Sequence, residues 1–199
     1  MEKEQRALAE QVEIRKSEDK PTTITGYAVK WGQLSSPLGW GDFQEQFQRG
    51  AFTKALAENR DNIYAAWNHD PANILGRAPN TLKIEEDEIG LRYEITPPSW
   101  AQKYVESIER GDVRGSSFIF SPVEQSWDES NPDMAIRTIT NANLFEVSPV
   151  TTPAYPTSSV GVRSAEAVYK EFRQKQDEPR FNELKQKQRQ RELDLLGRE

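Results

Sequence analysis

His69 is the only histidine in this chain of 199 residues, and the chain contains no cysteine. Imidazole is the side chain that exchanges protons most readily near neutral pH, so His69 is the one obvious candidate for a general base. It lies in the segment Trp67-Asn68-His69-Asp70-Pro71, where an apolar run ends and a turn begins. Taken alone, a single histidine at such a place is more often a loop or core residue without a special role.

A candidate nucleophile lies in the segment Arg114-Gly115-Ser116-Ser117-Phe118. A glycine, which lets the backbone turn sharply, precedes the two serines, and a strongly β-prone Phe-Ile-Phe sequence follows. A serine at the first position of such a strand can present its hydroxyl to a cleft. The plainer interpretation, a turn serine followed by a core strand, is favoured for these two residues considered alone.

The third candidate is Glu146, which Phe145 and Val147 flank. Its neighbours are expected to be buried, and a buried carboxylate needs a partner because it has lost its hydration. Glu146 is either an exposed residue on an outer strand face or the acceptor that orients His69. In the second case His69, Ser117 and Glu146 match a serine hydrolase: serine attacks, histidine carries the proton and a carboxylate orients the imidazole.

Composition excludes several other classes of function. The net charge of -6, from 26 basic and 32 acidic residues, argues against a general nucleic-acid-binding protein. No stretch approaches the apolar length of a membrane span, and the N-terminus does not resemble a signal peptide. One histidine without any cysteine argues against a zinc site. Neither a metal nor another cofactor is expected.

The chain divides into three zones. Residues 1–20 form an N-terminal arm that leads into a first strand near residues 12–15, and residues 13–163 form the folded domain with nearly all aromatic residues, glycines and prolines. Residues 164–199 are rich in Lys, Arg, Glu and Gln, and they predict a charged tail that is helical or disordered.

Short strand patterns dominate the domain. They occur at 24–31, 63–67, 117–123, 135–140, 144–147 and 160–162, and residues 82–95 predict a hairpin. Helices are expected at 50–57 and from Ser99, which is the predicted N-cap with Gln102 as its partner, to Gly111. Together these elements predict an α+β, mainly β fold: a closed or nearly closed barrel with helices packed outside.

Several short motifs, in a fixed order, resemble the tailed-phage prohead maturation protease family. They are Gly26-Tyr27-Ala28, the Phe47–Phe52 segment, Asn68-His69-Asp70, Gly115-Ser116-Ser117-Phe118, Glu146–Thr151 and Pro153-Ala154-Tyr155-Pro156. That family is similar to the herpesvirus assemblin proteases, which implies a barrel of about seven strands surrounded by helices. It also implies a serine endopeptidase that works inside the immature capsid, where it degrades the scaffold before DNA is packaged.

The resemblance assigns roles to individual residues. His69 matches the histidine of the Asn-His-Asp motif, and Ser117 matches the serine directly before the first Phe of the Gly-x-Ser-Phe motif, whereas Ser116 occupies the variable position. The related viral proteases use a second histidine, which this chain lacks. Either a carboxylate replaces it or the enzyme works as a dyad. Glu146 is the predicted carboxylate and Asp70 is its nearest rival.

Donors for an oxyanion hole are sought near the third catalytic residue. The backbone of the segment from Ser148 to Thr152 is a candidate because it directly follows Glu146, and Ser148 and Thr151 are the predicted donors. The related proteases use an arginine near this place, for which Arg163 and Arg137 are the candidate equivalents. The plainer interpretation of either arginine is a surface residue.

The same resemblance implies partners and a location. The expected partners are the phage scaffold and the major capsid protein, with a homodimer as a further expectation and neither nucleic acid nor membrane. The expected location is the procapsid in the host cytoplasm, and the tail 164–199 is expected to dock with scaffold and to be removed by self-cleavage. Two alternatives are a catalytically silent scaffolding or capsid-assembly protein with the same barrel, and an unrelated β-barrel binding module.

Overall fold

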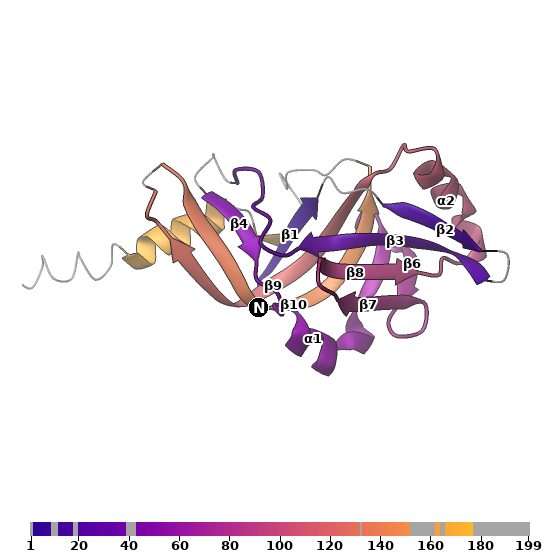
Figure 1. Ribbon diagram of the computed structural model, residues 1–199, viewed down its shortest axis with the longest axis horizontal. Helices are drawn as coiled ribbons and strands as arrows, with labels where there is room; N and C mark the ends of the chain where they lie inside the picture. Colours follow the sequence, from indigo (N-terminus) through magenta and orange to yellow (C-terminus); the bar gives the residue numbers. More distant parts are fainter. Residues whose placement is uncertain are drawn as a thin grey trace, which may run out of the picture.

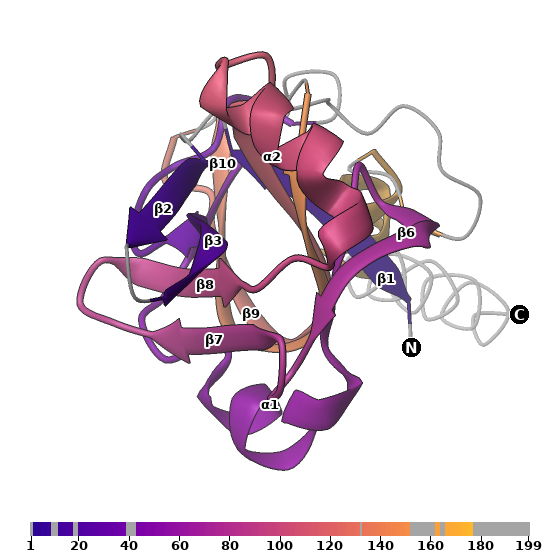
Figure 2. The same cartoon turned by 90° about the vertical axis from the view of Figure 1, so that its right-hand side faces the viewer.

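The computed structural model describes residues 2–8, 12–17, 20–38, 43–131, 133–151, 162–163 and 166–176. These residues form two β-sheets that face each other, with α1 (Thr53–Glu58) and α2 (Gln102–Glu109) on opposite sides of the space between them (Figures 1 and 2). A further helix over residues 166–176 lies beside the far end of the larger sheet (Figure 1).

The larger sheet has seven strands in the order β11-β1-β9-β10-β5-β6, with β4 also paired to β10. Its strands are β11 (Val162–Arg163), β1 (Lys3–Leu8), β9 (Gly115–Asp128), β10 (Ala135–Val150), β5 (Tyr64–Trp67), β6 (Asp70–Arg77) and β4 (Phe43–Phe47). The smaller sheet has four strands in the order β2-β3-β8-β7. They are β2 (Glu13–Ser17), β3 (Lys20–Lys30), β8 (Gly90–Ile95) and β7 (Leu82–Glu86). Two short 3-10 helices, η1 (Arg60–Asn62) and η2 (Ser99–Ala101), complete the labelled elements.

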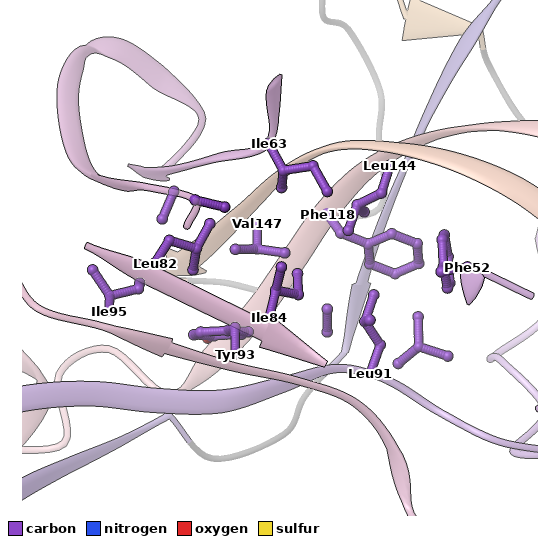
Figure 3. Packing of buried hydrophobic residues seen from close by; sticks show 14 of the residues in the cluster. Phe52, Ile63, Leu82, Ile84, Leu91, Tyr93, Ile95, Phe118, Leu144 and Val147 are labelled. Atoms are coloured by element: carbon purple, nitrogen blue, oxygen red, sulfur yellow. The ribbon is translucent and has the colours of Figure 1, made fainter. Parts of the chain in front are cut away.

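The hydrophobic core fills the space between the two sheets (Figure 3). Ile84 of β7 and Tyr93 of β8 face Phe118 of β9 and Val147 of β10, and all four side chains are buried. Alternation along each strand explains the arrangement, because every second side chain of a strand points to the same face. The alternate side chains of β9 and β10 point to the opposite face of the sheet, and the candidate site lies on that face.

The prediction of a mainly β fold is confirmed, but a closed barrel of seven strands is not. The described strands belong to two separate hydrogen-bonded sheets, and the larger sheet curls like half of a barrel. The hairpin predicted for residues 82–95 is present as β7 and β8. The separate strands predicted at 135–140 and 144–147 are parts of one strand, β10, because β-bulges after Ile139 and Leu144 let it bend without ending.

Two local predictions were wrong or incomplete. Ser99 does not cap a helix: it begins η2, and neither η2 nor α2 has a side-chain cap. The predicted end at Gly111 is confirmed, since Gly111 adopts a φ of 78° just after the last turn of α2, a conformation that glycine adopts without steric cost. Strands β1, β4 and β6 were not predicted.

The predicted polar tail begins with a helix that packs on the domain. Val168 is buried, and the Phe172 ring stacks on Trp127 of β9 at 4.1 Å between ring centroids. Tyr169 stacks on Phe43 of β4 at 5.7 Å. An ion pair between Arg173 and Glu129 at 2.9 Å adds a polar contact. The rest of the predicted tail, residues 177–199, lies outside the described residues.

Candidate active site

His69 lies at the tip of the β5–β6 hairpin. Trp67 and Asp70 pair across the hairpin, so only Asn68 and His69 form the loop. Both have positive φ values, 49° and 60°, as the favoured two-residue hairpin turns require. Glycine normally occupies the second of these positions, because other side chains are strained there by about 1–2 kcal/mol. The backbone that carries the imidazole is therefore held in a conformation that costs stability, which is typical of functional sites.

Three hydrogen bonds fix this loop to the end of β10. The Asn68 amide donates to the Pro149 carbonyl at 3.1 Å, and the Asn68 side-chain oxygen accepts from the Thr151 amide at 3.0 Å. The His69 amide donates to the Ser148 hydroxyl at 3.2 Å. This role of Asn68 was not predicted, although an Asn before the histidine is itself a signal for a positive-φ turn.

The register of the sheet brings the other candidate residues together. Ser117 of β9 pairs with Ser148 of β10, and Glu146, two residues before Ser148, lies on the same face. Glu146 also pairs with Tyr64 of β5. This face is opposite to the one that carries Phe118 and Val147 into the core. Ser117, Glu146 and Tyr64 thus line one outer patch, over which the hairpin holds His69.

The imidazole of His69 contacts both other candidates. Its Nε2 atom lies 2.6 Å from the Ser117 hydroxyl oxygen, and its Nδ1 atom lies 2.8 Å from Oε1 of Glu146. Serine, histidine and carboxylate are therefore in hydrogen-bond contact in the order that nucleophilic catalysis requires. The structure brings together the three residues that the sequence analysis selected.

Glu146 is buried, with 1% of its surface exposed, yet its carboxylate has several partners. The Ser148 hydroxyl donates to Oε1 at 2.5 Å, and the Tyr64 hydroxyl donates to Oε2 over a longer distance of 3.4 Å. Burial, and then the nearby Glu146 carboxylate, raise the pKa of the Tyr64 hydroxyl above its usual value, so it remains a donor. These contacts offset the loss of hydration that burial of a carboxylate entails.

Ser116 and Asp70, the rival candidates, have other partners. The Ser116 hydroxyl lies 2.6 Å from the Tyr93 hydroxyl on the core side of β9, where a Cβ at Gly26 would come within 3.1 Å of it. Asp70 accepts hydrogen bonds from the Ala72 amide at 2.9 Å and from the Asn73 side chain at 2.6 Å. Ser116 therefore packs the core, and Asp70 caps its own turn.

Among the predicted oxyanion donors, Ser148 pairs with Ser117 across β10 and β9. The Ser148 hydroxyl faces Glu146 and the His69 amide, and the Thr151 amide donates to Asn68. Arg137 is fully buried and contacts Glu4 and Glu45, so it is not the surface residue of the plainer interpretation. The Arg163 side chain lies outside the described part of the chain. The oxyanion assignments stay predictions.

A serine, a histidine and a carboxylate aligned on a β-scaffold are the constellation of a serine hydrolase. The sequence profile of the caudovirus prohead serine protease family matches residues 10–172, and the chain belongs to this family. The family resemblance is thereby confirmed. Neither a curated protein nor a solved structure matches the chain.

Family membership gives the chain a protease role in phage capsid maturation. It places that role inside the procapsid, in the host cytoplasm and among capsid proteins. Across the segments that the structure describes, no helix combines the length and the apolar character needed to cross a bilayer.

Proposed function

We propose that the chain is a serine endopeptidase in which Ser117 is the nucleophile, His69 the general base and acid, and Glu146 the orienting carboxylate. The observation that carries this proposal is the pair of contacts made by one imidazole, 2.6 Å to Ser117 and 2.8 Å to Glu146. Because the chain has a single histidine, no other imidazole can take over the role.

The proposed reaction has two halves. Ser117 Oγ forms a bond to the carbonyl carbon of the scissile peptide while His69 Nε2 takes the hydroxyl proton. The imidazolium, held by the Glu146 carboxylate, then gives the proton to the leaving amine as the C–N bond breaks. A water molecule repeats these steps on the acyl-serine, which releases the new carboxyl end and restores Ser117.

The proposed substrates are the phage scaffold protein or the scaffolding segment of the capsid protein, and the chain itself. Membership of the prohead protease family supports this choice because it implies work inside the procapsid. Within the chain, the tail from residue 164 onward is the proposed self-cleaved segment. A homodimer stays a prediction.

Co-expression with the capsid and scaffold proteins of the same genome tests the proposal, with the product masses measured by mass spectrometry. The wild-type chain should lose its tail and shorten its partners during assembly, whereas the Ser117→Ala chain should leave all three at full length. Ser116→Ala is the matched control: it removes the neighbouring buried hydroxyl, and processing should continue. Equal processing by the Ser117→Ala and wild-type chains would exclude Ser117 as the nucleophile.

The alternative is a catalytically silent scaffolding or assembly protein with the same fold. A fluorophosphonate probe, which reacts with activated serines, separates the two functions. Labelling of the wild-type chain that disappears in both Ser117→Ala and His69→Ala supports the endopeptidase. Absence of labelling under assembly conditions favours the silent protein.

A further inference from the structure

Strand β1 covers the proposed nucleophile. It runs antiparallel to the edge of β9, with Ala7 paired to Ser117 and Arg6 paired to Phe118. Ser117 has no exposed surface, and its hydroxyl oxygen lies 2.8 Å from the Arg6 carbonyl oxygen. A peptide carbonyl of the chain itself therefore already occupies the place beside Ser117 that a substrate carbonyl would need.

The contact with Arg6 also competes for the proton that catalysis moves. A serine hydroxyl has one hydrogen to donate, and a carbonyl oxygen can only accept. When Ser117 donates to the Arg6 carbonyl, the hydrogen is not available to His69 Nε2, which lies 2.6 Å from the same oxygen. Strand β1 thus both excludes other peptides and engages the proton of the nucleophile.

The inward-pointing side chains of β1 enter a group that we call the charged subsite, made of Glu45 of β4, Gln125 of β9 and Arg137 of β10. The Glu4 carboxylate accepts two hydrogen bonds from the Arg137 guanidinium, at 2.6 and 2.9 Å. Arg6 forms an ion pair with Glu45 at 2.8 Å. Bidentate contacts between a guanidinium and a carboxylate are both strong and selective in geometry.

The charges balance separately on the strand and in the charged subsite. Glu4 and Arg6 pair with each other at 2.7 Å, and Arg137 pairs with Glu45 at 2.6 Å. Departure of β1 therefore leaves no unpaired buried charge, which would otherwise be the main electrostatic barrier to release. After the strand, Val12 donates to the Arg114 carbonyl at 3.0 Å, so the chain stays anchored beyond β1.

We propose that β1 occupies the place of the substrate and must leave β9 before a peptide can reach Ser117. The corresponding substrate is an extended peptide that pairs antiparallel with β9. One of its residues takes the place of Arg6 and presents its carbonyl to Ser117, and the residue two positions earlier is acidic. Its acidic side chain takes the place of Glu4 on Arg137, and a basic side chain takes the place of Arg6 on Glu45. This inference depends on the proposed function, since it assigns the substrate class and the regulation of the same serine.

A reversible cross-link between β1 and β9 tests the need for release. Gln5 and Ile119 are direct partners, and antiparallel partners lie at separations that a disulfide can span. Because the chain has no cysteine, Gln5→Cys/Ile119→Cys introduces the only two thiols. The oxidised chain should react with a fluorophosphonate at least about tenfold more slowly than the reduced chain, since the rate follows the fraction of open sites.

The matched control cross-links the β7–β8 hairpin through Lys83→Cys/Glu94→Cys, partners that lie in the other sheet. Oxidation of this control should leave the labelling rate unchanged. Equal labelling of the oxidised and reduced Gln5→Cys/Ile119→Cys chain would overturn the inference. If no chain is labelled even when reduced, the proposed function fails instead. A binding measurement then tests whether β1 occupies a peptide-binding site.

The binding measurement does not require activity. A fluorescent peptide with the sequence of residues 2–8 is titrated into a Ser117→Ala chain whose own strand is loosened by Glu4→Ala/Arg6→Ala. Fluorescence anisotropy should show binding, and the same peptide with Glu4→Lys should bind at least about tenfold more weakly because it places a cation on Arg137. Equal binding of both peptides, or binding of neither, would show that β1 is not in a substrate site.

Discussion

The hydroxyl of Ser148 joins His69 to Glu146: it accepts a hydrogen bond from the His69 amide at 3.2 Å and contacts the Glu146 carboxylate at 2.5 Å. One small side chain therefore holds both the loop that carries the proposed base and the carboxylate that orients it. Ser148 is fully buried, so water cannot replace its hydroxyl easily. Ser148 was predicted as an oxyanion donor, but these contacts make it a positioning residue for His69 and Glu146.

Ser148→Ala should slow fluorophosphonate labelling of Ser117 by about 10²-fold, because a small displacement of a catalytic group has an effect of that order. The loss of a buried hydroxyl with its partners left in place should lower the free energy of unfolding by about 1–3 kcal/mol. Ser121→Ala removes a buried serine hydroxyl of the neighbouring strand β9, away from His69 and Glu146, and should leave labelling unchanged. Equal labelling rates in the two variants would contradict the positioning role.

Glu146→Gln should reduce the labelling rate by about 10⁴-fold, the loss seen when a triad carboxylate becomes an amide, because the imidazole then favours the wrong tautomer. The side chain keeps its shape, so urea unfolding should show a folded protein. Glu94→Gln, on β8 outside the site, is the control and should keep the wild-type rate. If Glu146→Gln retains that rate, the pair Ser117 and His69 works as a dyad.

His69→Gly should be more stable than His69→Ala by about 1 kcal/mol, because glycine adopts the φ of 60° at this position without the steric cost that alanine has. Both variants lack the imidazole, so the difference between them isolates the backbone strain of the hairpin. Urea denaturation of the two proteins measures it. A His69→Ala chain as stable as His69→Gly would mean that the loop stores no strain.

Local patterns predict the strands that bury apolar side chains, such as the hairpin of β7 and β8, because the alternation of those side chains is visible in the sequence. Strand β1 has no such apolar alternation: within residues 3–7 the buried side chains are Glu4 and Arg6, whose charges are balanced by residues of β4 and β10. Those partners are distant in sequence. Local sequence patterns therefore could not predict that β1 pairs with β9 and buries Ser117.

In the candidate site, too, the sequence predicts some features and only the structure explains the others. The identity of His69 followed from its uniqueness, and the choice of Ser117 over Ser116 followed from the family motif. The structure adds the reason: Ser116 points to Tyr93 in the core, whereas Ser117 shares a face with Glu146. The two-residue loop at Asn68 and His69 was not predicted, because its second position carries a histidine where such turns favour glycine.

Asp87 makes part of the stability depend on acid pH. Burial alone would raise the pKa of Asp87, but hydrogen bonds from the Gly90 amide, the Tyr27 hydroxyl and the Ile89 amide outweigh it and hold the pKa below its usual value. A lowered pKa in the folded state contributes stability above about pH 4, and this contribution is lost as the pH falls further.

The Asp87→Asn chain should therefore lose less stability than the wild-type chain between about pH 5 and pH 3, an interval that spans the usual aspartate pKa of about 3.9. Thermal unfolding at a series of pH values measures the difference. Asp112→Asn, which changes an exposed aspartate in an ion pair with Arg110, is the control. Parallel pH profiles for Asp87→Asn and the wild-type chain would show that Asp87 does not have this role.

Phe172 should anchor the helix at residues 166–176 to the domain, because its ring stacks on Trp127 at 4.1 Å between ring centroids. Trp127 lies ten residues beyond Ser117 on β9, so this contact is remote from the candidate active site. Phe172→Ala should weaken this packing by about 1–2 kcal/mol, the value of a partly buried aromatic side chain. Hydrogen exchange in the helix should become faster, while fluorophosphonate labelling of Ser117 should stay unchanged. Lys175→Ala removes an exposed side chain of the same helix and should alter exchange far less. Unchanged helix protection in Phe172→Ala would mean that other contacts hold the start of the tail.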